Sequence, residues 1–375
     1  MRKRYGKKIL AGILTAAMVS TFFTGCGKSS SDTISIGASF PQTGTIAPDG
    51  KTCLDAIKLA VKEANDGGGI NGKKIELVTE DDEGAPTSAA AIGNKFADND
   101  DIMGVIHSYN SSCALAQVDI YDDAGIPNFS PVATTPQLTG SSDYFYRTAP
   151  NDSFVGESAA TFMQEQGVKK VALFYENDDY GLGIAEAFED KCKEIGLDIV
   201  TTQTFVYGET VDFSTQLTAT SGSGADAIFI GGCVTEIGLI NEQKSDYGCG
   251  DLFVLGGNGA YAPALLDYGK AVEGIYVQGE FDVNVSDKAK KFVEAFEAEY
   301  DYEPGNWAAS AYDSACILIE AMKNVDGEIT RDKINEQIKE ITYEGVCGTY
   351  HFDNCDSSKA ELILQIKDGA FTLVE

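Results

Sequence analysis

Histidine is almost absent from this chain, which has only two, at positions 107 and 351. Neither lies in a motif with a nucleophile, and no G-x-S-x-G, H-E-x-x-H, P-loop or strand-linked G-x-G-x-x-G motif is present. No C-x-x-C pair and no Cys/His cluster occurs either, which argues against a zinc site. We therefore expect no enzyme activity, no metal and no cofactor. A surface hydrolase is the least favoured class of function.

Positive charge is also scarce, with 28 Lys and Arg against 58 Asp and Glu and a formal net charge of −30. Phosphate binding needs clustered Lys and Arg, so this balance excludes a nucleic-acid partner. Acidic runs such as those at 80–83 and 176–179 could serve acid/base chemistry or bind calcium. In so acidic a chain we interpret them as solvated loops at strand ends.

The longest early apolar run, 9–23, is short for a membrane span, which needs about 20 apolar residues. It follows five basic residues and no acid, which is the layout of a secretory signal over 1–25. The stretch 23–26, Phe-Thr-Gly-Cys, resembles a bacterial lipobox, which implies a lipidated Cys26 followed by a flexible tether over 26–32. We expect a lipid-anchored protein on the extracellular face of a Gram-positive cell membrane.

The other eight cysteines lie mostly within apolar patterns, where a free thiol behaves as a small hydrophobe. The pairs Cys347 with Cys355 and Cys233 with Cys249 could form disulfides outside the cell. The sequence leaves their state open.

Short apolar, β-branched runs alternate with amphipathic stretches from about 34 to 280, a pattern that predicts parallel sheets with crossover helices. The strands are nearly continuous in apolar residues, as expected where helices cover both faces of a sheet. The alternation restarts near residue 150, which indicates a second lobe. Helical stretches follow from 286, and strands of a hairpin with a turn at 367–369 close the chain.

Polar residues follow two of the predicted strands. Tyr109, Asn110 and Ser111 come after the strand at 101–107, and Thr134 follows the next one. In open α/β sheets the ligand crevice lies beyond the carboxyl ends of the strands, and a helix N-terminus attracts anions. These loops therefore predict a site for one small carboxylate. Ordinary N-capping by a serine of this loop, Ser111 or its neighbour, is the alternative.

Several stretches taken in order resemble the branched-chain amino-acid binding protein family, the type I periplasmic binding proteins of ABC transporters. They are "IGASFPQTGTIAPDGK", "AIKLAVKEANDGGGINGKKIELVTEDDEGAP", "AGIPNFSPVATTPQLT", "YFYRTAPND", "KKVALFYENDDYGLGIAEAF" and "VDFSTQL". The resemblance implies two Rossmann-like lobes joined by a three-segment hinge. Lobe 1 is expected over 33–151 plus 281–353 and lobe 2 over 152–280 plus 354–375, with the ligand trapped between them.

The same resemblance assigns site residues. Ser111 matches the carboxylate-binding serine, with Tyr109 and Asn110 beside it, and Thr134 matches a threonine, with Val132 and Ala133 contributing backbone groups. Tyr180 matches a tyrosine that reaches the ligand from lobe 2; the alternative is a turn aromatic that packs against its own lobe.

Three positions depart from the branched-chain pattern. Asn258 stands where the family has an acidic partner for the ligand's ammonium, Asp49 where it has an aromatic wall, and Cys233 where it has a tyrosine. An amide loses the charge-assisted bond, which is roughly twice as strong as a neutral one. The sequence therefore predicts either a relocated ammonium partner, namely Asp49, Glu236 or Glu280, or a ligand more polar than leucine.

The leading hypothesis is thus a monomeric, lipid-anchored receptor that binds an amino acid or similar small carboxylate and delivers it to the membrane subunits of an ABC permease. Two alternatives stay open. One is an extracellular sensor that reports its ligand to a membrane receptor, and the other is binding of a small carboxylate that is not an amino acid.

Overall fold

The computed structural model describes residues 33–357 and 361–374. The expected signal peptide, tether and Cys26 lie outside the described residues. The described chain alternates strands and helices and builds two seven-stranded sheets. The predicted α/β fold with two lobes is confirmed.

The first sheet has the strand order β13-β14-β5-β4-β3-β1-β2. Strands β1 to β5 are mutually parallel, as is β14 with β5, while β13 pairs antiparallel with β14. The bounds are β1 (Thr33–Phe40), β2 (Lys74–Asp81), β3 (Ile102–His107), β4 (Asn128–Ser130), β5 (Phe145–Arg147), β13 (Phe352–Asp353) and β14 (Asp356–Ser357).

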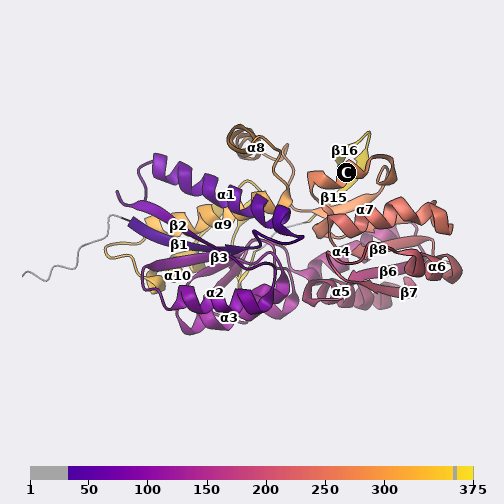
Figure 1. Ribbon diagram of the computed structural model, residues 1–375, viewed down its shortest axis with the longest axis horizontal. Helices are drawn as coiled ribbons and strands as arrows, with labels where there is room; N and C mark the ends of the chain where they lie inside the picture. Colours follow the sequence, from indigo (N-terminus) through magenta and orange to yellow (C-terminus); the bar gives the residue numbers. More distant parts are fainter. Residues whose placement is uncertain (1–32, 358–360, 375) are drawn as a thin grey trace, which may run out of the picture. The chain divides into compact units, whose positions relative to one another are not determined.

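Helices cover both faces of this sheet (Figure 1). One face carries the largest apolar core, built with α1 (Ala47–Asp66), α8 (Asp287–Tyr300), α9 (Asn306–Lys323) and α10 (Arg331–Glu340). The other face packs on α2 (Pro86–Ala97) and α3 (Ser111–Asp123). Burial on both sides explains why the strands are nearly continuous in apolar residues.

The second sheet has the order β16-β15-β10-β9-β8-β6-β7, with β6 to β10 parallel and an antiparallel hairpin at its edge. Helices α4 (Asp152–Glu165) and α5 (Asp179–Ile195) pack on one face, and α6 (Ser214–Ser223) and α7 (Val234–Gln243) on the other. The strands are β6 (Lys170–Glu176), β7 (Asp198–Phe205), β8 (Ala227–Gly231), β9 (Phe253–Gly256), β10 (Tyr276–Gly279), β15 (Leu362–Lys367) and β16 (Ala370–Leu373).

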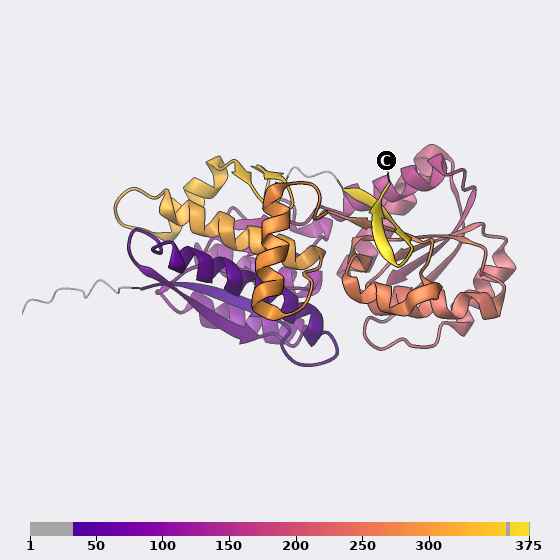
Figure 2. The same cartoon turned by 90° about the horizontal axis from the view of Figure 1, so that it is seen from above.

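The chain leaves the first sheet after β5, returns to it after β10 and leaves it again after β14. In Figure 2 the yellow C-terminal hairpin is accordingly separate from the amber helices α9 and α10. The last change of sheet comes after Ser357, a few residues beyond the expected boundary at 353, because β14 pairs with β5.

Smaller elements complete the fold. The hairpin expected around 367–369 is confirmed as β15–β16. The stretch 349–353 is divided between two sheets, since 349–350 pairs with 343–344 and 352–353 joins the first sheet. The remaining elements are β11 (Tyr343–Glu344), β12 (Thr349–Tyr350) and the 3₁₀ helices η1 (Pro136–Leu138), η2 (Lys244–Tyr247), η3 (Asn258–Ala260) and η4 (Pro263–Ala271).

All eight cysteines of the described chain are free thiols, and seven of them are buried. The pairs Cys347 with Cys355 and Cys233 with Cys249, which the sequence left open, are not bonded in the structure. Within 33–357 and 361–374, no helix has the length and apolar character that a membrane span requires.

Candidate ligand-binding site

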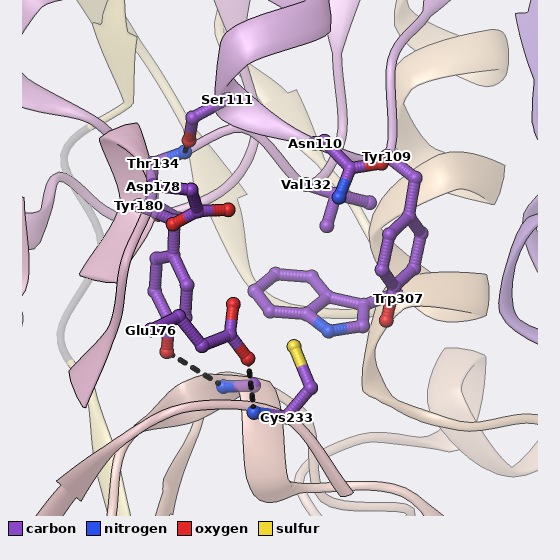
Figure 3. A pocket seen from close by; sticks show the side chains of 11 residues that line it. Tyr109, Asn110, Ser111, Val132, Thr134, Glu176, Asp178, Tyr180, Cys233 and Trp307 are labelled. Carbon is purple, nitrogen blue, oxygen red and sulfur yellow. Dashed lines mark hydrogen bonds between the residues drawn. The ribbon is translucent and has the colours of Figure 1, made fainter. Parts of the chain in front are cut away.

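A pocket lies where loops from the carboxyl ends of both sheets meet (Figure 3). Strands β3 and β4 lead into it from the first lobe, and β6, β8 and β9 from the second. It is lined by Tyr109, Asn110, Ser111, Val132, Thr134, Glu176, Asp178, Tyr180, Cys233, Gly259 and Trp307. Seven of the predicted site residues are thus brought together, namely Tyr109, Asn110, Ser111, Val132, Thr134, Tyr180 and Cys233.

One wall of the pocket, the hydroxyl wall, is formed by Ser111 at the start of α3 and Thr134 in the loop after β4. Ser111 Oγ accepts hydrogen bonds from the backbone N–H groups of Thr134 and Thr135, both at 3.3 Å. Thr134 Oγ1 is buried and has no hydrogen-bond partner of good geometry in the described chain. The N-cap of α3 is Asn110, and its side chain makes no capping bond, so serine N-capping is not what the structure shows. This wall offers donors for an anion.

A buried polar network supports this wall from behind. His107 lies with Nε2 3.0 Å from Asn128 Oδ1 and Nδ1 2.8 Å from Ser108 Oγ, and Ser108 Oγ lies 2.9 Å from Gln117 Oε1. Ser108 has a φ of 63°, a left-handed conformation that is rare for a residue with a side chain. Burial lowers the pKa of His107 to about 4, so the imidazole is neutral at pH 7. Among the residues that the structure describes, no group of His, Cys, Asp and Glu could hold a metal ion.

Arg147 anchors the loop that carries Thr134. Its guanidinium group is fully buried and donates to the carbonyl oxygens of Thr134 at 2.9 Å and Thr135 at 2.8 Å. It also donates to Thr139 Oγ1 and forms an ion pair with Asp356 of β14. These bonds hold the hydroxyl wall in place and connect it to the last strand of the first sheet.

The opposite wall is acidic. Glu176 is the last residue of β6 and is 1% exposed, and its Oε1 accepts a hydrogen bond from the Cys233 N–H at 2.8 Å. Asp178 caps α5, since its Oδ1 accepts from the Gly181 N–H at 2.9 Å. Burial raises the pKa of Glu176 well above its ordinary value, and the charge of Asp178 adds to the effect. The interpretation of 176–179 as a solvated loop is therefore wrong for Glu176.

Tyr180 lines the pocket and is also bound within its own lobe. Its O–H donates to Asn258 Oδ1 at 3.3 Å, and its oxygen accepts from the Gly259 N–H at 3.4 Å. Both interpretations of Tyr180 therefore describe part of its environment. Asn258 itself is fully buried behind Tyr180 and is not among the lining residues. A side chain at Gly259 would lie 2.7 Å from the Gly232 carbonyl oxygen, so the backbone approaches here too closely for any other residue.

Trp307, at the start of α9, supplies an aromatic surface that the sequence reasoning missed. It is the only tryptophan of the chain and is 6% exposed. With Tyr109, Val132 and Cys233 it forms the apolar part of the pocket. Two signals were available. Trp307 is the only tryptophan, and it is the second residue of a helix that begins directly after Gly305.

Asp49, the expected replacement for an aromatic wall, does not line the pocket but lines an adjoining cavity, and Tyr109 and Trp307 line both spaces. Its Oδ2 accepts a hydrogen bond from the Tyr207 O–H at 3.1 Å. Burial raises the pKa of Asp49.

The remaining predicted residues lie outside the pocket lining. Glu236 is fully buried, and its Oε1 accepts from the Gly208 N–H at 2.8 Å. Glu280 is 3% exposed at the end of β10, and Ala133 is fully buried between its two lining neighbours.

This fold and this site define a class of protein, the two-lobed α/β proteins that bind a small solute between strand-end loops. The sequence pattern of the periplasmic binding protein family matches residues 33–363, and the chain belongs to that family. The predicted resemblance is confirmed.

Three similar proteins are named or solved with a ligand. The leucine-, isoleucine-, valine-, threonine- and alanine-binding protein of Pseudomonas aeruginosa is 27% identical over 86% of each chain. The branched-chain amino acid transporter substrate-binding protein LivJ of Streptococcus pneumoniae, solved with isoleucine, is 32% identical with a TM-score of 0.83 and covers 91% of this chain and 99% of its own. An ABC transporter solute-binding protein of Rhodopseudomonas palustris, solved with 3,4-dihydroxybenzoic acid, is 25% identical with a TM-score of 0.85 and covers 92% and 96%.

Two further buried carboxyl groups make stability depend on pH. Burial raises the pKa of Asp152 to about 8 and that of Asp82 to about 6. An unfolded Asp has a pKa of about 3.9. The folded protein therefore binds more protons than the unfolded chain between about pH 4 and pH 8, and its stability falls as pH rises across this range. We expect a higher melting temperature at about pH 5.5 than at about pH 8.5.

Repulsion among the many acidic groups also lowers stability as pH rises. The Asp152→Asn variant is the control that separates this effect from the titration of Asp152. Its melting temperature should change less between the two pH values than that of the wild type. An equal change in both proteins would show that Asp152 does not contribute.

Proposed function

We propose that this protein is the solute-binding component of an ABC importer and binds an amino acid or similar small carboxylate in the pocket. The observation that carries the proposal is Thr134 Oγ1, a buried hydroxyl of the pocket lining that lies near the Asp152 carboxyl but has no hydrogen-bond partner of good geometry in the described chain. A buried polar group left unpaired costs about 1–3 kcal/mol, which a ligand oxygen at this position offsets. The amino acids and the dihydroxybenzoic acid of the similar proteins all carry a carboxylate.

In this proposal the carboxylate is bound by Ser111, Thr134 and the free N–H groups at the start of α3. Tyr180 and the other second-lobe residues contact the ligand from the opposite side. Because the ligand interacts with both lobes, it stabilises the conformation in which the two lie together, and that conformation is the one presented to the permease. We propose that the protein acts as a monomer.

We also propose that the protein catalyses no reaction. The pocket does contain one thiol, Cys233. Burial and the nearby carboxyl groups of Glu176 and Glu236 raise the pKa of Cys233 well above its ordinary value. A protonated thiol is a poor nucleophile.

The single tryptophan provides the test. L-amino acids, aromatic acids and short peptides are titrated while Trp307 emission and heat of binding are recorded. We expect at least one carboxylate to change both signals, and Trp307→Phe to lose the emission change while heat is still released. Absence of binding by every carboxylate tested would overturn the proposal.

We propose further that Cys26 becomes the lipidated first residue of the mature protein. The support is the sequence of residues 1–32, since one acyl chain alone anchors only weakly and a diacylated cysteine anchors stably. Mass spectrometry of membrane-derived protein is expected to find a diacylated Cys26, and Cys26→Ser should release the protein from a Gram-positive cell. An unmodified Cys26 would contradict this assignment.

A further inference from the structure

The acidic wall of the pocket contains no cation. No Lys, Arg or His is among the lining residues. None of the ion pairs in the described chain involves Glu176 or Asp178. A buried carboxylate without a cation is strongly unfavourable, so such a group either takes up a proton or receives a positive partner.

Glu176 is placed to receive that partner. Figure 3 shows its carboxyl group on the side of the pocket opposite Ser111, with one oxygen bonded to the Cys233 N–H and the other directed into the pocket. An α-amino acid carries its carboxylate and its ammonium on one carbon. A ligand held by Ser111 and Thr134 thus presents its ammonium to the remaining volume of the pocket, which Glu176 borders.

We infer that Glu176 binds the ammonium group of the ligand, so that the solute is an α-amino acid or a similar small zwitterion. This inference rests on the proposed function of the pocket. It has support independent of the acidic wall, because the Thr134 hydroxyl on the other wall has no hydrogen-bond partner of good geometry in the described chain and so favours a ligand oxygen there. A plain carboxylate such as a benzoate satisfies only the hydroxyl wall.

The other acidic groups are less suited to this role. Asp178 uses one oxygen as the N-cap of α5 and is partly exposed. Glu236 is bonded to the loop at Gly208 and does not line the pocket, and neither do Asp49 and Glu280. The relocated ammonium partner expected among those three residues is therefore assigned to a fourth, Glu176.

The test compares each L-amino acid that binds with its deaminated analogue, for example L-leucine with 4-methylpentanoate and L-phenylalanine with 3-phenylpropanoate. Wild type is expected to bind the amino acid at least ~10-fold more tightly than the analogue, because a hydrogen bond to a charged group contributes about 1.5–3 kcal/mol. Glu176→Gln keeps the acceptor for the Cys233 N–H and removes the charge. It should weaken amino-acid binding by roughly 10- to 100-fold and leave analogue binding equal or improved.

Glu186→Gln is the matched control, since it removes the same charge from an exposed position on α5. It should leave both affinities unchanged. Asp178→Asn should have a smaller effect than Glu176→Gln.

The pH dependence of affinity is a second measurement, independent of how well a variant folds. Because Glu176 must be ionised to bind an ammonium and burial raises its pKa, affinity for an amino acid should rise as the pH is raised over the range measured, and affinity for the analogue should fall. In the Glu176→Gln variant, the affinity for the amino acid and the affinity for the analogue should both depend less on pH. The titratable groups facing Glu176 are Asp178, Tyr180, Cys233, Glu236, Tyr207 and Tyr109. The pKa of the tyrosines and the thiol is raised, so they stay protonated in this range.

The results separate this inference from the proposed function. If amino acids and their analogues bind equally and Glu176→Gln changes neither, or if Asp178→Asn alone is impaired, Glu176 is not the ammonium site although the pocket binds carboxylates. If no carboxylate binds at all, the proposed function fails as well.

Discussion

The Ser111→Ala, Thr134→Ala double variant is expected to bind its ligand at least ~100-fold more weakly than the wild type. In the proposed complex each hydroxyl donates to the ligand carboxylate, and a hydrogen bond to a charged group contributes about 1.5–3 kcal/mol. Two such bonds correspond to at least ~3 kcal/mol, and every 1.4 kcal/mol is about tenfold in affinity. The measurement is titration of Trp307 fluorescence with the carboxylate that the wild type binds best.

Ser111 also holds the loop of Thr134 through two backbone N–H groups, so stability needs its own control. Ser112→Ala removes a hydroxyl from the same first turn of α3, outside the pocket lining. This variant should bind normally. Equal affinity of the double variant and the wild type would show that the carboxylate lies elsewhere.

Replacing Arg147 with Met is expected to lower the free energy of unfolding by about 3–5 kcal/mol, the usual effect of removing one member of a buried ion pair. The change leaves Asp356 without its cation and the carbonyl oxygens of Thr134 and Thr135 without a donor. Ligand affinity should fall too, because the loop that presents Thr134 loses its anchor. Urea unfolding monitored by circular dichroism gives the stability, and fluorescence titration gives the affinity.

Arg331→Met is the comparison for this variant. Arg331 is only partly buried and donates to the backbone carbonyl oxygens of Ile102, Ala124 and Asn99. Its loss should cost less stability and leave affinity unchanged. A loss below about 1 kcal/mol for Arg147→Met would mean that solvent replaces the guanidinium group easily.

The hydroxyl wall could be predicted from the sequence because its residues follow strands directly. Ser111 and Thr134 come after two neighbouring parallel strands, and the carboxyl ends of such strands meet at one edge of the sheet. The positions of Ser111 and Thr134 directly after these strands were therefore enough to predict that the two residues lie together.

The acidic wall and the aromatic surface could not be predicted in the same way. Glu176 is one of many acidic residues in strand-end loops, and only its 1% exposure distinguishes it from solvated neighbours. Trp307 enters the pocket from a helix that belongs to the first lobe but follows strands β6 to β10 of the second lobe in sequence. Asp49 was expected in the pocket because the family resemblance matches it to an aromatic wall position, yet it lines the adjoining cavity, which shares Tyr109 and Trp307 with the pocket.

The order in which the strands join the sheets has a consequence for synthesis of the protein. The first sheet takes the strands of one edge from 352–357 and the second from 362–373, so both sheets lack an edge until these residues have been synthesised. Domains generally fold as units during synthesis, the N-terminal one first. Here neither lobe is complete early. The same short stretch of chain, 352–373, thus completes both sheets.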